Sequence, residues 1–141
     1  MEKINSKLLN LNNNREKEKL FEIYFSYLDE TQKIFDTLYI LGMPEENRSI
    51  TNIFSAIESC HLNILSKKRR LIFLDKDNSN DDFFQYIEEK TNEILKIVMV
   101  NEDQKQDAVS LLFMFWKKHV KEYNIKALVF ITEIHKSIFQ K

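Results

Sequence analysis

The sequence predicts an all-α protein that folds as a single domain. Its 141 residues include one glycine and one proline, which leaves little of the turn chemistry that hairpins and β-sandwiches need. Apolar residues recur at helical spacing through most of the chain. The length suffices for one substantial core, and no internal repeat or linker divides the sequence. We therefore expect one helical domain over residues 1–141.

Charge, cysteine content and hydropathy each exclude a class of function. Lysine and arginine (21) nearly balance aspartate and glutamate (22), so charge gives no case for a nucleic-acid partner. No apolar run approaches the roughly 18 residues of a membrane span. The polar N-terminus does not resemble a secretory signal, so we expect a cytoplasmic protein without membrane insertion. Cys60 is the only cysteine, which excludes a disulfide or a thiolate zinc site within one chain.

The first part of the chain predicts long amphipathic helices. Residues 1–13 hold a short apolar cluster and form either a small docking helix or a disordered end. Apolar spacing over 15–41 predicts one long helix or two abutting helices with a bend near 29–32. Gly42, followed by Pro44, supplies the stop.

A third helix is expected to start at Ser49 as its N-cap and to continue to about Leu65. Cations follow over 67–70, where they suit the negative end of the helix dipole. The apolar run 71–74 either extends this helix or forms a buried connector.

Capping patterns predict the remaining helices. Ser79 with Asp82 resembles a capping box, and Asn101 with Gln104 repeats the pattern. The last two helices are expected over 102–123 and 125–140. Their apolar arcs span roughly 160° and roughly 220°, against about 100° for an ordinary surface helix. We expect this surplus to cover either a larger internal core or a partner chain.

No residue pattern predicts catalysis. His119 and Glu122 have the HxxE spacing of a carboxylate metal site, but a metal needs two or three further ligands, and the sequence has no second such pair. We therefore expect no metal. No glycine-rich loop is available for phosphate, and no serine or cysteine stands in a recognisable context with a base. We expect no enzyme activity.

Two features suggest ligand binding, and each has a simpler interpretation. His61, with Arg69 and Arg70 further along the same helix, is a candidate site for an anion; the simpler interpretation is a core histidine and solvated cations at a helix end. The phenylalanines on the apolar faces of the predicted helices either line an elongated apolar pocket or fill the core.

The order of helices, together with segments such as LLFMFWKKHVKEY, resembles a globin. In a haem globin the proximal histidine lies on the helix that here spans about 81–100, which contains no histidine or cysteine, so we expect no haem. The pattern is similar to the non-haem globin sensor domains of Bacillus. It most resembles small stand-alone sporulation-inhibitory proteins akin to the sensor domain of a sporulation histidine kinase.

This resemblance implies a globin-like homodimeric regulator that binds a fatty acid in a tunnel, with a chloride nearby, and diverts the activating signal of the kinase. The implied tunnel residues are Phe54, Ile57, His61, Phe84, Ile87, Leu112 and Phe115, and the implied anion-binding residues are His61, Arg69 and Arg70. The implied dimer interface uses Phe113, Trp116, Val120, Leu128, Ile131, His135 and Ile138.

The alternative is a ligand-free helical bundle that works as an interaction or inhibitor protein. It would be Bcl-2-like or of the immunity type, with a groove for a partner helix. Native mass spectrometry distinguishes the two hypotheses, because only the first predicts retained lipid mass.

Overall fold

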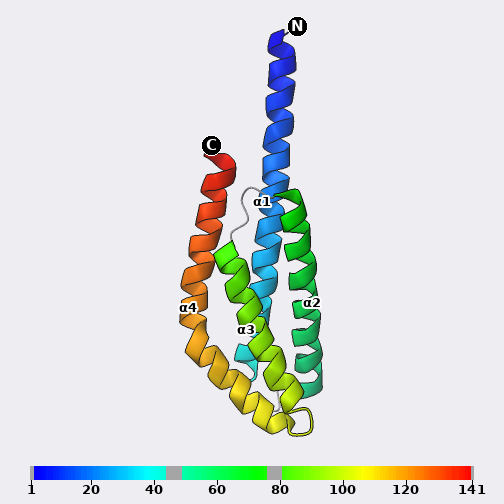
Figure 1. The fold of residues 1–141 in the computed structure, drawn as a ribbon, viewed down its shortest axis with the longest axis vertical. Coiled ribbons are helices and arrows are strands. Elements are labelled where there is room, and N and C mark those ends of the chain that lie inside the picture. The colour runs from blue at the N-terminus through cyan, green and yellow to red at the C-terminus, as the bar shows by residue number, and fades with distance from the viewer. Residues whose placement is uncertain (1, 44–48, 76–80, 141) are drawn as a thin grey trace.

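In the computed structural model, the described residues form an elongated bundle of four helices that run alternately down and up (Figure 1). They are α1 (Glu2–Ile40), α2 (Ile50–Leu74), α3 (Asp81–Val100) and α4 (Lys105–Phe139). The structure describes residues 2–43, 49–75 and 81–140, with side chains over 13–43, 49–75 and 82–140. No strand occurs in these ranges, so the all-α prediction is confirmed.

α1 is one continuous helix from Glu2, and its first turns extend beyond the ends of the other helices (Figure 1). It therefore includes most of the segment 1–13 that the sequence left open. The predicted stop is confirmed, since the helix ends at Ile40 and the Gly42 N–H bonds the carbonyl of Tyr39 at 3.0 Å. Gly42 is packed so closely against the ring of Phe113 that a Cβ atom there would overlap the ring. Pro44 lies outside the described residues.

α2 begins and ends with identifiable caps. The Ser49 hydroxyl accepts a hydrogen bond from the Asn52 N–H at 3.4 Å, as its predicted N-cap role requires. The apolar run 71–74 extends this helix, which settles the choice that the sequence left open. Asp75 closes it, with its N–H bonded to the carbonyl of Leu71 at 2.8 Å. The predicted cap at Ser79 lies outside the described residues.

The predicted cap at Asn101 is wrong, because this side chain belongs to the end of α3. Its amide donates to the carbonyl of Ile97 at 2.9 Å. Gln104 is the N-cap of α4 and makes no side-chain capping bond. A tight turn therefore joins α3 to α4 with little side-chain support at the start of α4.

The predicted break between residues 123 and 125 is also wrong. α4 continues through this point and bends earlier along its length (Figure 1). Asn124 is a weak helix former, but no glycine or proline accompanies it. Tyr123 and Ala127, on either side, are both buried, so packing holds the helix continuous.

The core surrounds the middle of α1, which lies between α2 and α4 with α3 in front (Figure 1). Rings from three helices meet there: Phe130 stacks on Phe83 at 4.3 Å and lies edge-on to Tyr24, Tyr27 and Phe84. Such edge-on and offset contacts are the favoured geometries of aromatic pairs. The described residues thus form four helices, fewer than the sequence predicted, because α1 and α4 are each continuous, and a globin-like arrangement stays a prediction.

Candidate functional site: the groove between α3 and α4

A wide hollow lies between the end of α3 and the first half of α4. It encloses about 650 Å³ and is mostly apolar. Its lining residues are Glu93, Lys96, Ile97, Val100, Asn101, Leu111, Met114, Phe115, Lys118 and His119. We call it the α3–α4 groove. A volume of this size lies within the usual range of small-molecule sites.

The sequence makes this groove by continuing apolar residues to the very end of α3. Val100 is 73% exposed, and Met114 on the facing helix is 65% exposed. Phe115, one residue on, is buried and forms the floor. Apolar side chains from both helices therefore line the groove and leave apolar surface exposed.

The rim of the groove carries a net positive charge. Lys96 and Lys118 are both exposed there. The negative charge of Glu93 is partly neutralised by Lys90. Its carboxylate lies 3.8 Å from the ammonium of Lys90, whose side chain is only 15% exposed. Two lysines thus remain to attract an anionic group at the mouth of an apolar hollow.

His119 also lines the groove and is half-buried. Burial, reinforced by the charge of Lys90, lowers its pKa below the ordinary histidine range. Its ring lies 4.4 Å from that of Phe115. A neutral ring can still donate one hydrogen bond to an anionic head group without bringing a buried charge.

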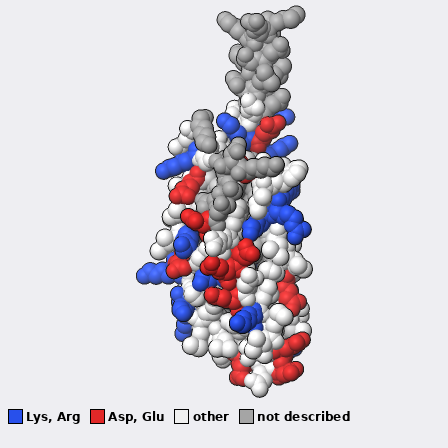
Figure 2. Space-filling model, viewed as in Figure 1, with Lys and Arg blue, Asp and Glu red and all other residues white. Residues whose placement is uncertain are grey.

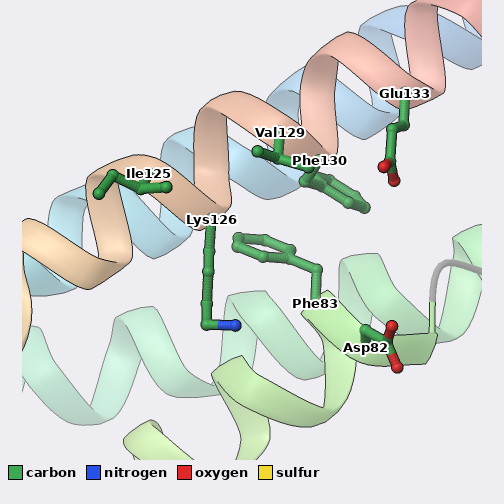
Figure 3. A pocket seen from close by; sticks show the side chains of 7 residues that line it. All are labelled: Asp82, Phe83, Ile125, Lys126, Val129, Phe130 and Glu133. Atoms are coloured by element: carbon green, nitrogen blue, oxygen red, sulfur yellow. The ribbon is translucent and has the colours of Figure 1, made fainter.

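A second, smaller hollow of about 310 Å³ lies further along the same two helices (Figure 3). Phe83 and Phe130 form its floor, and Asp82 and Glu133 stand at one end. Lys126 lines the other side, with its ammonium 5.2 Å from the ring of Tyr86. Its charges are of mixed sign, so it shows no preference for an anion.

Apolar residues also line the face of α4 that points away from the core. They are Leu111, Met114, Ile125, Leu128 and Val129, and we call them the outer stripe. The most exposed, Leu128, has 67% of its surface open. The core of one chain therefore does not use all the apolar surface of α4.

The predicted tunnel residues lie together in the core. Phe54, Ile57, Phe84, Ile87, Leu112 and Phe115 are all buried, and of these only Phe115 also lines the α3–α4 groove. His61 is half-buried, and its Nδ1 has no hydrogen-bond partner among the described residues.

The structure does not bring the predicted anion-binding residues together. Arg69 lies eight positions beyond His61 on α2, roughly 12 Å along the helix. Arg69 and Arg70 are both exposed. Burial lowers the pKa of His61, which favours its neutral form and weakens it as an anion ligand.

The predicted dimer residues divide between the core and the surface. Leu128 is exposed on the outer stripe, whereas Ile138 is buried in the chain's own core. Phe113 and Trp116 stack at 5.8 Å, and His135 lies edge-on to Phe21 at 5.5 Å. The remaining two, Val120 and Ile131, are half-buried.

The sequence analysis missed most of the groove residues. Leu111 and Met114 belong to the apolar segment LLFMFW, in which the structure leaves these two exposed and buries Leu112 and Phe115. Their exposure depends on where α3 lies, which the segment alone does not reveal. Lys96 and Lys118 carry no distinguishing signal, because exposed lysines occur on most helices.

Charge is unevenly distributed on the face that Figure 2 shows. Acidic side chains gather over α3 and at the lower end of the bundle, while basic ones lie over the upper part of α2 and along α4. Among the described residues, no helix is long and apolar enough to cross a bilayer, and no group of three His, Cys, Asp or Glu side chains could hold a metal ion.

Comparison with known proteins gives no identification, since no family model, no curated protein and no solved structure matches this chain.

Proposed function

We propose that this protein is a non-catalytic sensor that binds an anionic amphiphile, with a fatty acid as the simplest example, in the α3–α4 groove. The observation that carries the proposal is the combination of apolar walls with Lys96 and Lys118 at the rim. The acyl chain would lie against Val100 and Met114, and the carboxylate would face the lysines.

This arrangement matches the two needs of such a ligand. Each methylene that is half covered contributes roughly 0.4 kcal/mol of binding, half of the value for full burial. A carboxylate that stays at an exposed rim keeps part of its hydration and gains a charged hydrogen bond. The location differs from the tunnel that the family resemblance implies, because the residues assigned to that tunnel fill the core.

Calorimetric titration of the protein with dodecanoate tests the proposal. We expect saturable binding at one site, tightening roughly twofold for each added methylene between decanoate and tetradecanoate. Dodecanol, which has the chain without the charge, should bind more weakly. Equal affinity for the acid and the alcohol would contradict the role given to the lysines.

Two substitutions on α4 form a matched pair for the same titration. Met114 and Leu128 are almost equally exposed, at 65% and 67%, but only Met114 lines the groove. Met114→Glu should weaken dodecanoate binding by tenfold or more, since it places a carboxylate in the path of the chain. Leu128→Glu should bind at least as tightly as the wild type. A similar loss in both variants would show that the groove is not the site.

The wider proposal is a homodimeric cytoplasmic regulator that inhibits sporulation by diverting the activating signal of a sensor histidine kinase. It is supported by the family resemblance and by the outer stripe of α4, which offers apolar surface for a second chain. Expression of the protein in a sporulating Bacillus should lower spore counts, and Met114→Glu should lose the effect. Unchanged counts with the wild-type protein would reject this role.

The second candidate is a ligand-free interaction protein. The filled core and the exposed outer stripe favour it, because both would suit a surface that only binds another protein. Native mass spectrometry of freshly purified protein decides between the candidates. Retained lipid mass supports the sensor, whereas bare protein that also ignores added dodecanoate supports the interaction protein.

A further inference from the structure

We propose that the end of α2 holds the protein against the surface of an anionic lipid bilayer, without crossing it. The net charge of the whole chain is only −1, but cations and exposed apolar side chains gather at this helix end. The inference goes beyond the proposed function, because this surface lies on α2, whereas the groove lies between α3 and α4.

Four cations follow one another near the end of α2, and the structure divides them into two pairs. The ammonium groups of Lys67 and Lys68 reach carboxylates on α1 and α3, at 3.5 Å and 3.0 Å. Arg69 and Arg70 are exposed and form no ion pair with the described residues. The first pair therefore holds α2 in the bundle, and the second pair is left to bind a partner.

Apolar side chains are exposed directly beside these arginines. Phe73, one turn beyond Arg69, is 77% exposed, the largest fraction for any large apolar side chain that the structure describes. Ile72 and Leu74, on either side of Phe73, are exposed as well. A cluster of open apolar side chains marks a surface that binds a partner.

The cluster points away from the other helices. Lys67 and Lys68 mark the directions of α1 and α3 around the axis of α2. At 100° per residue, Leu62, Arg69 and Phe73 lie roughly 150–170° from the midpoint between these two directions, within an arc of roughly 40°. All three are exposed. They form one outward face along the second half of α2.

The charges on this part of α2 are of one sign. Glu58 is the only acidic residue of α2, and it lies roughly 16 Å before Arg69 along the helix. Figure 2 shows basic side chains gathered over the upper part of α2. The face therefore suits a partner that presents negative charge above an apolar layer.

An anionic bilayer has both of these properties. Lipid phosphates accept paired hydrogen bonds from guanidinium groups, which Arg69 and Arg70 supply. Phe73 enters the acyl boundary below the phosphates, as the aromatic and aliphatic side chains of interfacial helices do. A nucleic-acid duplex also offers phosphates, but it has no apolar layer beneath them.

Sedimentation with lipid vesicles tests the proposal. The protein should bind phosphatidylcholine vesicles that contain about 30% phosphatidylserine, and it should ignore pure phosphatidylcholine. Arg69→Glu/Arg70→Glu should lower the affinity roughly thirtyfold or more, since each charge at the surface contributes about fivefold. Phe73→Ala should lower it roughly tenfold. Leu128→Ala, which removes an exposed side chain from α4, should leave it unchanged.

A second charge reversal provides the matched control. Lys117→Glu/Lys121→Glu changes the net charge by the same amount at two exposed positions of α4, on the other side of α1 from α2 (Figure 1). Its affinity should stay within about twofold of the wild type, because salt screens distant charges. A similar loss in both double variants would overturn the proposal. Should Arg69→Glu/Arg70→Glu lose its helical circular dichroism, Arg69→Gln/Arg70→Gln repeats the comparison.

Tryptophan fluorescence distinguishes a bilayer from other partners. In a Trp116→Phe background, the emission of Phe73→Trp should shift to shorter wavelength when phosphatidylserine vesicles are added, and that of Leu128→Trp should not. A wild type that ignores these vesicles but binds an RNA duplex or an acidic protein would overturn the proposal, as would vesicle binding without the shift at position 73. Met114→Glu, expected to lose dodecanoate, should bind vesicles like the wild type, so that the two proposals fail separately.

Discussion

The two sides of the bundle are held together by different kinds of contact. Between α1 and α2, Lys67 reaches both Ser26, at 2.5 Å, and the buried carboxylate of Glu30, at 3.5 Å. The Tyr24 hydroxyl donates to Asp75 at 2.8 Å. Between α3 and α4 the structure has ring contacts, such as Phe83 on Phe130, and the ammonium of Lys126 lies over the ring of Tyr86; two hollows interrupt these contacts. Hydrogen bonds and an ion pair thus hold α1 and α2 together, while apolar surface stays exposed between α3 and α4.

This difference suits one side of the bundle to stabilising the fold and the other to binding a ligand. Buried polar bonds tolerate little rearrangement, because an unpaired group would be left without water. Apolar walls tolerate a guest, since contacts with a ligand or a second chain replace contacts with water. The α1–α2 side therefore acts as the frame, and the α3–α4 side carries the proposed site.

Among substitutions on α4, the largest loss of stability is expected where the helix packs against the frame. Phe130 is 1% exposed and contacts rings on two other helices, so Phe130→Ala should cost roughly 3–5 kcal/mol of unfolding free energy. Leu128→Ala, two positions away on the outer stripe, should change it by no more than about 0.5 kcal/mol. Urea denaturation followed by circular dichroism measures both. Equal losses would mean that the outer stripe is not exposed.

Glu30 should make the frame sensitive to acid. Burial raises the pKa of its carboxyl, but the hydrogen bond to Lys33 and the charges of Lys33 and Lys67 outweigh this, and the pKa lies below the ordinary glutamate value. The stabilisation is present above that ordinary value and is lost as the pH falls through it towards the folded pKa.

The variant Glu30→Gln tests this directly. It should cost about 1–3 kcal/mol near pH 7, because it removes a charged hydrogen bond. Between about pH 5 and about pH 3.5, the wild type should lose more stability than the variant. Parallel pH profiles for the two proteins would show that Glu30 does not contribute in this way.

The tyrosines of the core should give smaller and opposite effects. Thr31 donates to the carbonyl of Leu28, so the Tyr123 hydroxyl must donate to Thr31, at 2.6 Å. Tyr123→Phe should therefore cost about 1 kcal/mol. The hydroxyl of Tyr27 is buried without a hydrogen-bond partner among the described residues, so Tyr27→Phe should be neutral or slightly stabilising. Thermal unfolding of both variants ranks them, and the reverse order would contradict the assignment.

A small gain in stability is expected at the turn between α3 and α4. Gln104 caps α4 without a side-chain hydrogen bond, so Gln104→Asp should gain about 0.5–1 kcal/mol. Ser49→Ala, which removes a working cap on α2, should lose a similar amount. A gain at both positions, or at neither, would mean that capping does not limit these helices.

The sequence predicted helix ends correctly where a single residue of a distinctive type determines the end. Gly42 ended α1, and Ser49 capped α2, because each supplies a local geometry that few residues can. The prediction of a cap at Asn101 was wrong because its side-chain amide donates to the carbonyl of Ile97 at the end of α3. The predicted break at Asn124 was wrong because the buried side chains of Tyr123 and Ala127 keep α4 continuous.

The candidate site was harder to predict, because it depends on which apolar residues remain uncovered. Periodicity showed that α4 is too apolar for one core, and the exposure of Leu128 agrees with that. It could not show that Val100 of α3 and Met114 of α4 line the same groove. Gaps follow from where two helices diverge, and this is set by the whole bundle.

Mapping dodecanoate onto the backbone by NMR tests the central claim most directly. Titration into ¹⁵N-labelled protein should shift amide signals at the end of α3 and in the first half of α4, around Lys96, Val100, Met114 and Lys118. Amides around Phe54 and Ile57, in the core of the frame, should stay in place. Shifts centred on Phe54 and Ile57, or no saturable shifts at all, would contradict the account.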